Sequence, residues 1–171
     1  MADNFFNEKA NGSMATPSQN ETMRELILFT VGDLLCGLDI SQAQEINRHL
    51  SITPVPQAPH YVRGVLNLRG QVITIIDLRV KLELEPVDLS DDKRIIVVHN
   101  DTDGVGLLVD SVSDIIAVNE KYMAAPPSNI GGVRGEFFSA VYKMETHLAA
   151  VIDIRKVLEK EDRNMIKKES L

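Results

Sequence analysis

The sequence predicts an all-β protein built from two small β-barrels. Short runs of β-branched and aliphatic residues alternate with turn signals rich in Gly, Asn and Asp, which is typical of strands joined by tight turns. The two halves of the chain also repeat one pattern of residues, which indicates a duplicated unit. Short strands at close spacing favour barrels over a sandwich, because closure of a sheet removes its exposed edges. Each half is near the size at which an isolated domain is marginally stable, so we expect the units to share a core.

The composition is that of a globular protein without a basic surface. Of the 171 residues, 44% are hydrophobic, which is enough to form a core. The 25 acidic residues outnumber the 18 basic ones, and the net charge is −7. Proteins that bind nucleic acid carry basic surfaces and stacking aromatic residues, whereas only 5% of this chain is aromatic and none of it is Trp. A nucleic-acid-binding barrel is therefore a disfavoured alternative.

Cysteine usage and hydropathy predict a cytoplasmic protein. Cys36 is the only cysteine, which excludes an internal disulfide and a cysteine-based metal cluster. Its neighbours in sequence are apolar, and we expect a small buried side chain rather than a nucleophile. The first residues do not resemble a signal peptide, and no apolar run approaches the ~20 residues that span a bilayer, so we expect no membrane insertion.

The ordered part of the chain is expected to begin with a hairpin. Residues 1–23 are polar and lack apolar periodicity, which predicts a disordered N-terminal tail. Order is expected from Leu26. The runs at 26–31 and 34–40 flank a Gly-Asp turn and predict two antiparallel strands, the second with every other residue on one core face.

An irregular crossing is predicted to follow the hairpin. Residues 41–46 leave the hairpin, and three prolines within 53–59 prevent regular strand pairing there. Residues 59–63 begin with Pro and precede a Gly, which predicts one short helical turn. The stretch 64–79 contains Asn-Leu-Arg-Gly and then an apolar run, so we predict a tight turn that leads into a strand, 72–76, buried on both faces.

The second half of the chain repeats the hairpin theme. A polar connection at 83–93 precedes two predicted strands, at 94–99 and 105–109. Residues 122–135 contain Pro-Pro and Gly-Gly pairs and are expected to be irregular. The C-terminal segment, 156–171, has alternating charges and few apolar positions, which predicts a surface helix or tail.

The internal repeat can be followed along the two halves. Residues 37–46 align with 106–115, because each stretch opens with Gly and ends with an acidic residue before Ile. Residues 73–79 align with 149–155, because each ends in Asp, then Leu or Ile, then Arg. The chain is therefore predicted to contain two copies of one small all-β unit, at about 26–84 and 94–155.

No residue set in the sequence indicates a catalytic centre. The Gly-x-Gly at 104–106 lacks the third glycine and the lysine of a phosphate-binding loop, and the four histidines stand apart from one another, so we expect no metal or cofactor. Asp77 and Asp153 occupy equivalent places in the two copies. They are either a convergent carboxylate pair of an enzyme or, more simply, strand-ending side chains that accept hydrogen bonds from nearby backbone amides.

Glu45 and Arg69 lie at polar ends of apolar strands in the first copy. A carboxylate and a guanidinium in such places can form an ion pair that braces two loops, or they can face a partner protein. Both interpretations of this pair remain open on the residues alone.

These motifs together resemble the CheW family of adaptors, which couple chemoreceptors to a histidine kinase. The resemblance covers residues 24–160. It is carried by a hydrophobic first strand, a Gln-Glu-Ile triplet, the Asn-Leu-Arg-Gly turn, the Asp-Leu-Arg strand end and a Val-Asp-Ser-Val-Ser-Asp stretch, at 26–31, 44–46, 67–70, 77–79 and 109–114. Similar domains form the regulatory end of CheA kinases and part of receiver-fused adaptors, but the length of this chain favours the stand-alone adaptor.

The resemblance implies two tandem SH3-like five-stranded barrels that share a core, with short helices and a C-terminal helix. It implies a non-catalytic adaptor of bacterial chemotaxis, recruited to membrane-associated receptor arrays. The implied partners are the cytoplasmic tip of a chemoreceptor and the regulatory domain of a CheA-type histidine kinase. A CheW-like scaffold in a non-chemotaxis chemosensory pathway is the alternative.

The resemblance also implies which residues bind these partners. The charged pair at the binding surface is Glu45 and Arg69, and the two apolar contact positions are Ile40 and Ala43. The two residues that shape the adjoining turn are Gly64 and Asn67. Ala43 stands where the family usually has a larger β-branched residue, and Thr74 where proline is common. We expect the smaller side chain of Ala43 to affect receptor affinity more than the fold.

Overall fold

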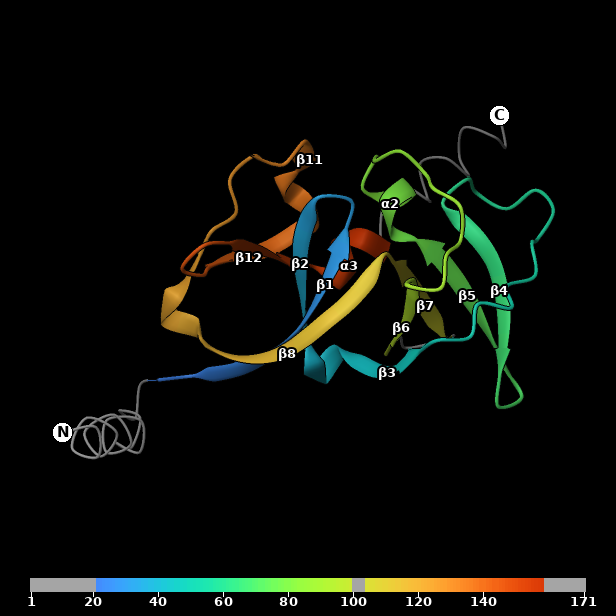
Figure 1. The fold of residues 1–171 in the computed structure, drawn as a ribbon, viewed down its shortest axis with the longest axis horizontal. Helices are drawn as coiled ribbons and strands as arrows, with labels where there is room; N and C mark the ends of the chain where they lie inside the picture. Colours follow the sequence, from blue (N-terminus) through green and yellow to red (C-terminus); the bar gives the residue numbers. More distant parts are fainter. Residues whose placement is uncertain (1–20, 100–103, 159–171) are drawn as a thin grey trace.

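The structure, a computed structural model, describes residues 21–99 and 104–158 and places them in two large β-sheets (Figure 1). The first sheet has the order β8-β1-β2-β13-β12-β9 and the second the order β3-β6-β7-β5-β4. The strands of the first sheet are β8 (Ser111–Asn119), β1 (Met23–Val31), β2 (Leu34–Asp39), β13 (Leu148–Ile152), β12 (Phe138–Lys143) and β9 (Met123–Ala124). Those of the second sheet are β3 (Ala43–Asn47), β6 (Arg94–Val98), β7 (Val105–Val109), β5 (Gln71–Asp77) and β4 (Val62–Leu68).

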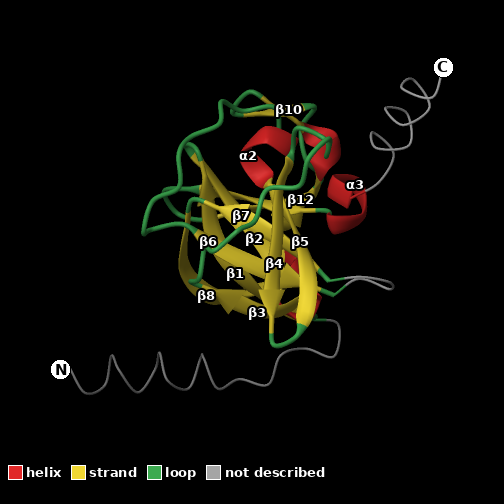
Figure 2. Cartoon of the chain, turned by 90° about the vertical axis from the view of Figure 1, so that its right-hand side faces the viewer, coloured by secondary structure: helices red, strands yellow, loops and turns green. Residues whose placement is uncertain are grey.

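Short elements connect these strands. A small hairpin pairs β10 (Asn129–Ile130) with β11 (Val133–Arg134). The described helices are α2 (Leu78–Lys81), α3 (Ile154–Leu158) and the 3-10 turns η1 (Ile40–Gln42), η2 (Glu120–Tyr122) and η3 (Gly135–Phe137). Figure 2 shows α2 and α3 at the same end of the strands. The prediction of an all-β fold with a few short helices is confirmed. The second sheet has the five strands predicted for each unit, whereas β9 adds a sixth strand to the first sheet.

The internal repeat relates the two sheets, but each sheet contains a hairpin from the other half of the chain. The order β8-β1-β2-β13-β12 corresponds strand by strand to β3-β6-β7-β5-β4. The register repeats as well: Gly37 of β2 pairs with Val151 in the first sheet, and Gly106 of β7 pairs with Ile75 in the second. The β1–β2 hairpin accordingly lies between β8 and β13, which are far from it in sequence, and Figure 1 shows it beside β8.

Each exchanged hairpin joins its sheet through one parallel strand pair, β2 with β13 and β7 with β5. The units predicted at about 26–84 and 94–155 describe repetition in the sequence, whereas the sheets are built across these two segments. Separation of the two sequence segments into independent units would break both parallel pairs. The exchange therefore favours unfolding of the whole structure in one step.

Alternate residues of the central strands face two different cores. Ile76 packs with Phe29 and Leu107 in a large core to which both sheets contribute, which confirms the predicted shared core. Ile75, next to Ile76, packs instead in a small core of the second sheet. Full burial of such a side chain contributes roughly 1.5–3 kcal/mol, so strands buried on both faces stabilise the fold strongly. The prediction for 72–76 holds at its three isoleucines, whereas Val72, beside the β4–β5 turn, is 60% exposed.

Two boundaries in the first half differ from the sequence prediction. β1 begins at Met23 rather than Leu26, because Met23 pairs with Asn119 across the long strand β8, which the sequence did not indicate. Residues 59–63 do not form the predicted helical turn. The Val62 N–H donates to the Pro59 carbonyl at 2.9 Å in a tight turn, and β4 starts there.

Two segments of the second half also differ. The region at 122–135, predicted to be irregular, contains the β10–β11 hairpin, with Gly131 and Gly132 in its turn at positive φ. The C-terminal helix begins at Ile154, and the helix docks on the shared core through Ile154 and Val157. The rest of the predicted C-terminal helix and most of the predicted N-terminal tail lie outside the described residues.

Candidate functional site

A shallow apolar groove of about 190 Å³ lies where β3 and β8 approach each other. The two strands are repeat equivalents, and within the described residues each pairs with one neighbour, β3 with β6 and β8 with β1. We call this feature the β3–β8 groove. Its lining comes from β1, η1, β3 and β8 and consists of Ile27, Ile40, Ala43, Gln44, Glu45, Ile46 and Ile115.

Three isoleucines of the groove are exposed to solvent. Ile40 is 36% exposed, Ile46 is 38% exposed and Ile115 is 47% exposed. Ile46 and Ile115 are equivalent in the repeat, and they pair with the equivalent residues Ile96 and Ile27. Large apolar side chains gathered at one exposed place are typical of a surface that binds another protein.

The position of Ile40 is set by polar contacts at the start of η1. Asp39 Oδ1 accepts hydrogen bonds from the Ser41 backbone N–H at 2.9 Å and from the Ser41 hydroxyl at 2.7 Å. Asp39 Oδ2 lies 3.5 Å from Nε of Arg24, and the same nitrogen lies 2.6 Å from Glu120 Oε1. These contacts hold the backbone of η1 and leave the apolar side chain of Ile40 at the groove.

The β4–β5 turn places Arg69 beside the groove. Arg69 and Gly70 have φ values of 53° and 83°, which is the geometry of a two-residue hairpin turn, and Asn67 Oδ1 accepts the Gly70 N–H at 3.1 Å. Arg69 Nη1 lies 3.2 Å from Glu45 Oε2, with the arginine side chain 80% exposed and the glutamate 21% exposed. A non-glycine residue in this conformation costs of order 1 kcal/mol, and such strain is typical of functional positions.

The structure brings four of the predicted binding residues together. Ile40, Ala43 and Glu45 line the groove, and Arg69 joins them through its ion pair with Glu45. The sequence alone left open whether Glu45 and Arg69 pair with each other, and the structure shows that they do.

The other two predicted residues act on the backbone. Asn67 is exposed and caps the turn that carries Arg69. Gly64 is buried in β4 at a φ of 147°, and a Cβ atom there would lie 2.2 Å from the backbone oxygen of Thr53. Gly64 therefore permits the close crossing of Thr53 over β4, where Thr53 and Val65 form an isolated bridge, and does not line the groove.

Ile46 and Ile115 are groove residues that the prediction of binding residues omitted. Both looked like ordinary strand residues, because an alternating apolar pattern does not tell which face is covered by other parts of the chain. The signal that could have found Ile115 is the repeat itself, which aligns it with Ile46, next to Glu45.

Asp77 and Asp153 are structural residues at the ends of strands in different sheets. Asp77 Oδ1 accepts the backbone N–H of Arg79 at 3.1 Å, and Asp153 Oδ1 accepts that of Arg155 at 3.0 Å. The predicted strand-ending role is confirmed. Within residues 21–99 and 104–158, no cluster of three or more metal-binding side chains occurs, and no helix is long and apolar enough to span a membrane.

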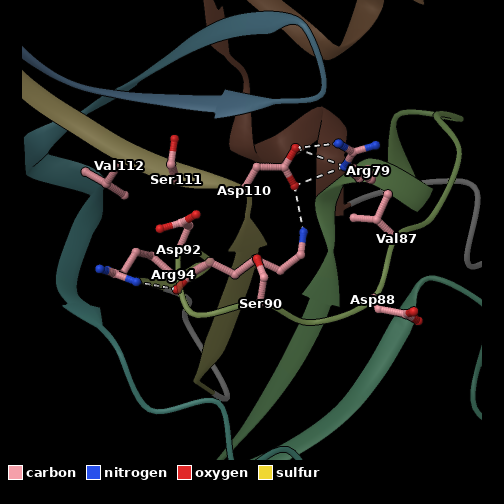
Figure 3. Close-up of a pocket in the computed structure, with 10 residues that line it drawn as sticks. Arg79, Val87, Asp88, Ser90, Asp92, Arg94, Asp110, Ser111 and Val112 are labelled. Carbon is pink, nitrogen blue, oxygen red and sulfur yellow. Dashed lines mark hydrogen bonds and ion pairs between the residues drawn. The ribbon is translucent and has the colours of Figure 1, made fainter.

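A cluster centred on Asp110 joins the two sheets (Figure 3). Its carboxylate accepts hydrogen bonds from Arg79 Nε at 2.9 and 3.0 Å, from Lys93 Nζ at 2.7 Å and from the Gly32 N–H at 2.7 Å. Burial by itself would raise the pKa of Asp110, but the hydrogen bonds from Arg79 and Lys93 outweigh it and lower the pKa. Gly32 belongs to the β1–β2 turn, and Arg79 to α2 beside the second sheet, so Asp110 ties the exchanged hairpin to its neighbour.

Comparison with known proteins decides the family. The model of the CheW-like domain matches residues 25–162. The chain belongs to the CheW family. It is 35% identical over 140 residues to the chemotaxis protein CheW of Rhizobium meliloti, a match that covers 82% of this chain and 90% of that protein. It is 32% identical over 141 residues to the CheW of Bacillus subtilis, with the same coverage of 82% and 90%.

A solved structure has the same fold. The crystal structure of the scaffolding protein TtCheW from Thermoanaerobacter tengcongensis matches with a TM-score of 0.74 and 28% sequence identity. The match covers 84% of this chain and 93% of that one. The two-sheet arrangement that positions the β3–β8 groove is therefore that of the CheW fold.

Proposed function

We propose that this chain is a non-catalytic adaptor of bacterial chemotaxis, which couples the cytoplasmic tip of a chemoreceptor to the regulatory domain of a CheA-type histidine kinase. It acts in the cytoplasm at membrane-associated receptor arrays and holds its two partners side by side. The observation that carries the proposal is the β3–β8 groove, with its exposed isoleucines and its Glu45–Arg69 pair, in a chain of the CheW family.

The groove suits the apolar face of a helical receptor tip. Three partly exposed isoleucines offer area whose burial is favourable by roughly 25 cal/mol per Å². Helices that dock in such grooves do so through apolar residues spaced along one face. The apolar contacts therefore supply much of the affinity for the receptor.

The charged pair supplies orientation. The Arg69 guanidinium is 80% exposed and bonded to Glu45 on one side, so its remaining donors are available to a partner. A planar guanidinium binds carboxylate or carbonyl oxygens in a defined direction. Arg69 thus selects receptor tips that present an acceptor next to their apolar face.

Ala43 sets the width of the groove. Its methyl group leaves more room in the lining than a β-branched residue would, so a receptor tip with a bulkier apolar residue at this contact fits best. Ala43→Val fills this room. We expect Ala43→Val to change the ranking of receptor tips by affinity and to leave kinase binding unchanged.

The test of the adaptor role is calorimetric titration of the folded protein with a CheA-type regulatory domain and, separately, with a receptor tip fragment. Binding of both partners is expected, and Arg69→Glu should weaken the receptor interaction at least tenfold, because it places like charges together at Glu45. Lys143→Glu, a change of an exposed cation in β12, is the matched control and should bind as the unmodified protein does. Failure of both partners to bind at high micromolar concentration would refute the proposal.

A further inference from the structure

The repeat places two surface hollows at equivalent positions. One hollow, of about 540 Å³, is lined by Arg79 and Asp110 (Figure 3), and the other, of about 430 Å³, is lined by Arg155 and Ser41. We call them the Asp110 hollow and the Ser41 hollow. The aligned stretches 37–46 and 106–115 make Ser41 the equivalent of Asp110, and Arg155 is the equivalent of Arg79 in the same way.

A second cation is also equivalent in the two hollows. Leu28 and Val97 pair with the equivalent glycines of β2 and β7, which makes Arg24 of β1 the counterpart of Lys93, next to β6. Arg24 lines the Ser41 hollow and Lys93 lines the Asp110 hollow. Both hollows are thus flanked by two cations at matching places.

The two hollows differ in the carboxylate between the cations. In the Asp110 hollow, the carboxylate lies 2.8 Å from Arg79 Nη2 and 2.7 Å from Lys93 Nζ. At the equivalent place the Ser41 hollow has a hydroxyl, and that hydroxyl donates to Asp39. The Ser41 hollow therefore has no carboxylate at the position equivalent to Asp110, although Asp39 and Asp153 also line it.

Arg155 is the cation of the Ser41 hollow that has no carboxylate partner among the described residues. Arg24 is engaged by Asp39 and Glu120, whereas the exposed side chain of Arg155 forms no ion pair with any residue that the structure describes. Asp153 lines the same hollow, but its Oδ1 accepts the backbone N–H groups of Arg155 and Lys156. Within residues 21–99 and 104–158, the guanidinium of Arg155 is therefore left available to a further carboxylate.

We infer that the Ser41 hollow receives the carboxylate of an Asp or Glu side chain of the kinase regulatory domain, held by Arg155 as Asp110 is held by Arg79. This inference rests on the proposed function for the identity of the occupant. The Ser41 hollow shares no lining residue with the β3–β8 groove, which is assigned to the receptor, so it is free to serve the second partner. An exposed arginine–carboxylate pair alone adds less than about tenfold in affinity, so Arg155 would not retain a small free carboxylate such as acetate. A carboxylate on a protein surface that is docked through other contacts would be retained.

The first test asks whether the hollow holds a carboxylate in the isolated protein. Ser41→Asp places a carboxylate where Asp110 stands in the equivalent hollow. The shift in Tm caused by Ser41→Asp should be measured at pH 7 and low salt. It should be at least 3 °C more favourable with Arg155 present than with Arg155→Gln, and this coupling should shrink as the pH falls towards 3 and the introduced carboxylate becomes protonated. Lys143→Gln should show no coupling. Absence of coupling with Arg155 would overturn the inference.

The second test addresses the occupant by calorimetry with the full chain. Arg155→Gln and Ser41→Asp should each weaken binding of a CheA-type regulatory domain about three- to fivefold, and Arg155→Gln should reduce the salt dependence of that binding. Lys143→Gln and Arg155→Gln should both bind the receptor tip normally. Unchanged kinase affinity in both hollow variants, or a loss of receptor binding in Arg155→Gln, would refute the assignment. If the unmodified protein bound neither partner, the proposed function would fail, and the coupling test would still decide whether the hollow holds a carboxylate.

Discussion

Arg69 holds its guanidinium 3.2 Å from the Glu45 carboxylate while its own backbone lies in the left-handed region, at a φ of 53°. The pair joins the β4–β5 turn to β3 at the mouth of the β3–β8 groove. Because a glycine would occupy this backbone conformation without strain, an arginine here favours a role for its side chain over a role in the turn.

Arg69→Gly should therefore make the protein more stable and weaken its receptor binding. The free energy of unfolding is expected to rise by about 0.5–1 kcal/mol, because the left-handed strain is removed and an exposed ion pair contributes little. Affinity for a receptor tip should fall at least tenfold. Urea unfolding and calorimetry measure the two effects, and a variant that lost stability and kept receptor affinity would show that Arg69 is a structural residue only.

Gly64→Ala is expected to destabilise the fold severely. The added Cβ would lie 2.2 Å from the Thr53 backbone oxygen, which cannot move aside as a flexible side chain could, and the φ of 147° disfavours any side chain. We expect a loss of more than about 2 kcal/mol in urea unfolding. Gly70→Ala is the matched comparison: no atom lies within 4 Å of a Cβ there, so only the φ of 83° acts and the loss should be about 1 kcal/mol. Equal losses in the two variants would contradict the crossing of Thr53 as the cause.

The sequence was sufficient to predict several strands of this fold but not how they associate. β-branched runs and turn signals located the first hairpin, β5, β6 and β7, because these features act locally. The exchange of hairpins between the two sheets depends on parallel pairs such as Gly37 with Val151, and no local signal encodes a contact between residues so far apart. The bulge between Ala43 and Glu45, and its equivalent in β8, likewise follow from tertiary pairing.

The candidate site was predictable only in part, for a related reason. Glu45 and Arg69 stood out because they lie at polar ends of apolar strands and match the charged pair that the family resemblance implies. Ile115 did not, since its exposure depends on which elements leave β8 uncovered. The Asp110 cluster was missed because Arg79, Lys93 and Gly32 converge on Asp110 from three separate segments.

Cys36 should react with thiol reagents only when the protein unfolds. Its side chain is fully buried, and burial raises the pKa of the thiol, with the charge of Asp110 acting in the same direction, so the reactive thiolate is suppressed. Labelling with a coloured disulfide reagent at pH 8 should proceed at the rate of global opening in native buffer and within the mixing time in concentrated urea. A Cys36→Ala, Lys143→Cys variant provides the exposed control and should react at once in native buffer. Rapid labelling of native Cys36 would contradict its place in the core.

Asp110→Asn should destabilise the protein in a pH-dependent way. The substitution leaves Arg79 and Lys93 without the carboxylate that joins them, and removal of one member of a partly buried ion cluster costs about 2 kcal/mol at neutral pH. Because the folded-state pKa of Asp110 is lowered, the stabilisation by this carboxylate is complete above the unfolded-state pKa of about 4 and is lost as the pH falls through the lower folded-state value. The difference in the free energy of unfolding between the two proteins should therefore be constant from pH 8 to pH 5 and shrink below pH 4.

The control for this prediction is Asp92→Asn, a change of an exposed carboxylate that lines the same hollow. Asp92 forms no ion pair with the residues that the structure describes, so its replacement should alter the free energy of unfolding by less than about 0.5 kcal/mol at any pH. Urea unfolding followed by circular dichroism between pH 3 and pH 8 measures both variants. A pH-independent loss in Asp110→Asn would mean that the residue acts through packing, and the tie between the β1–β2 turn and α2 would then not depend on its charge.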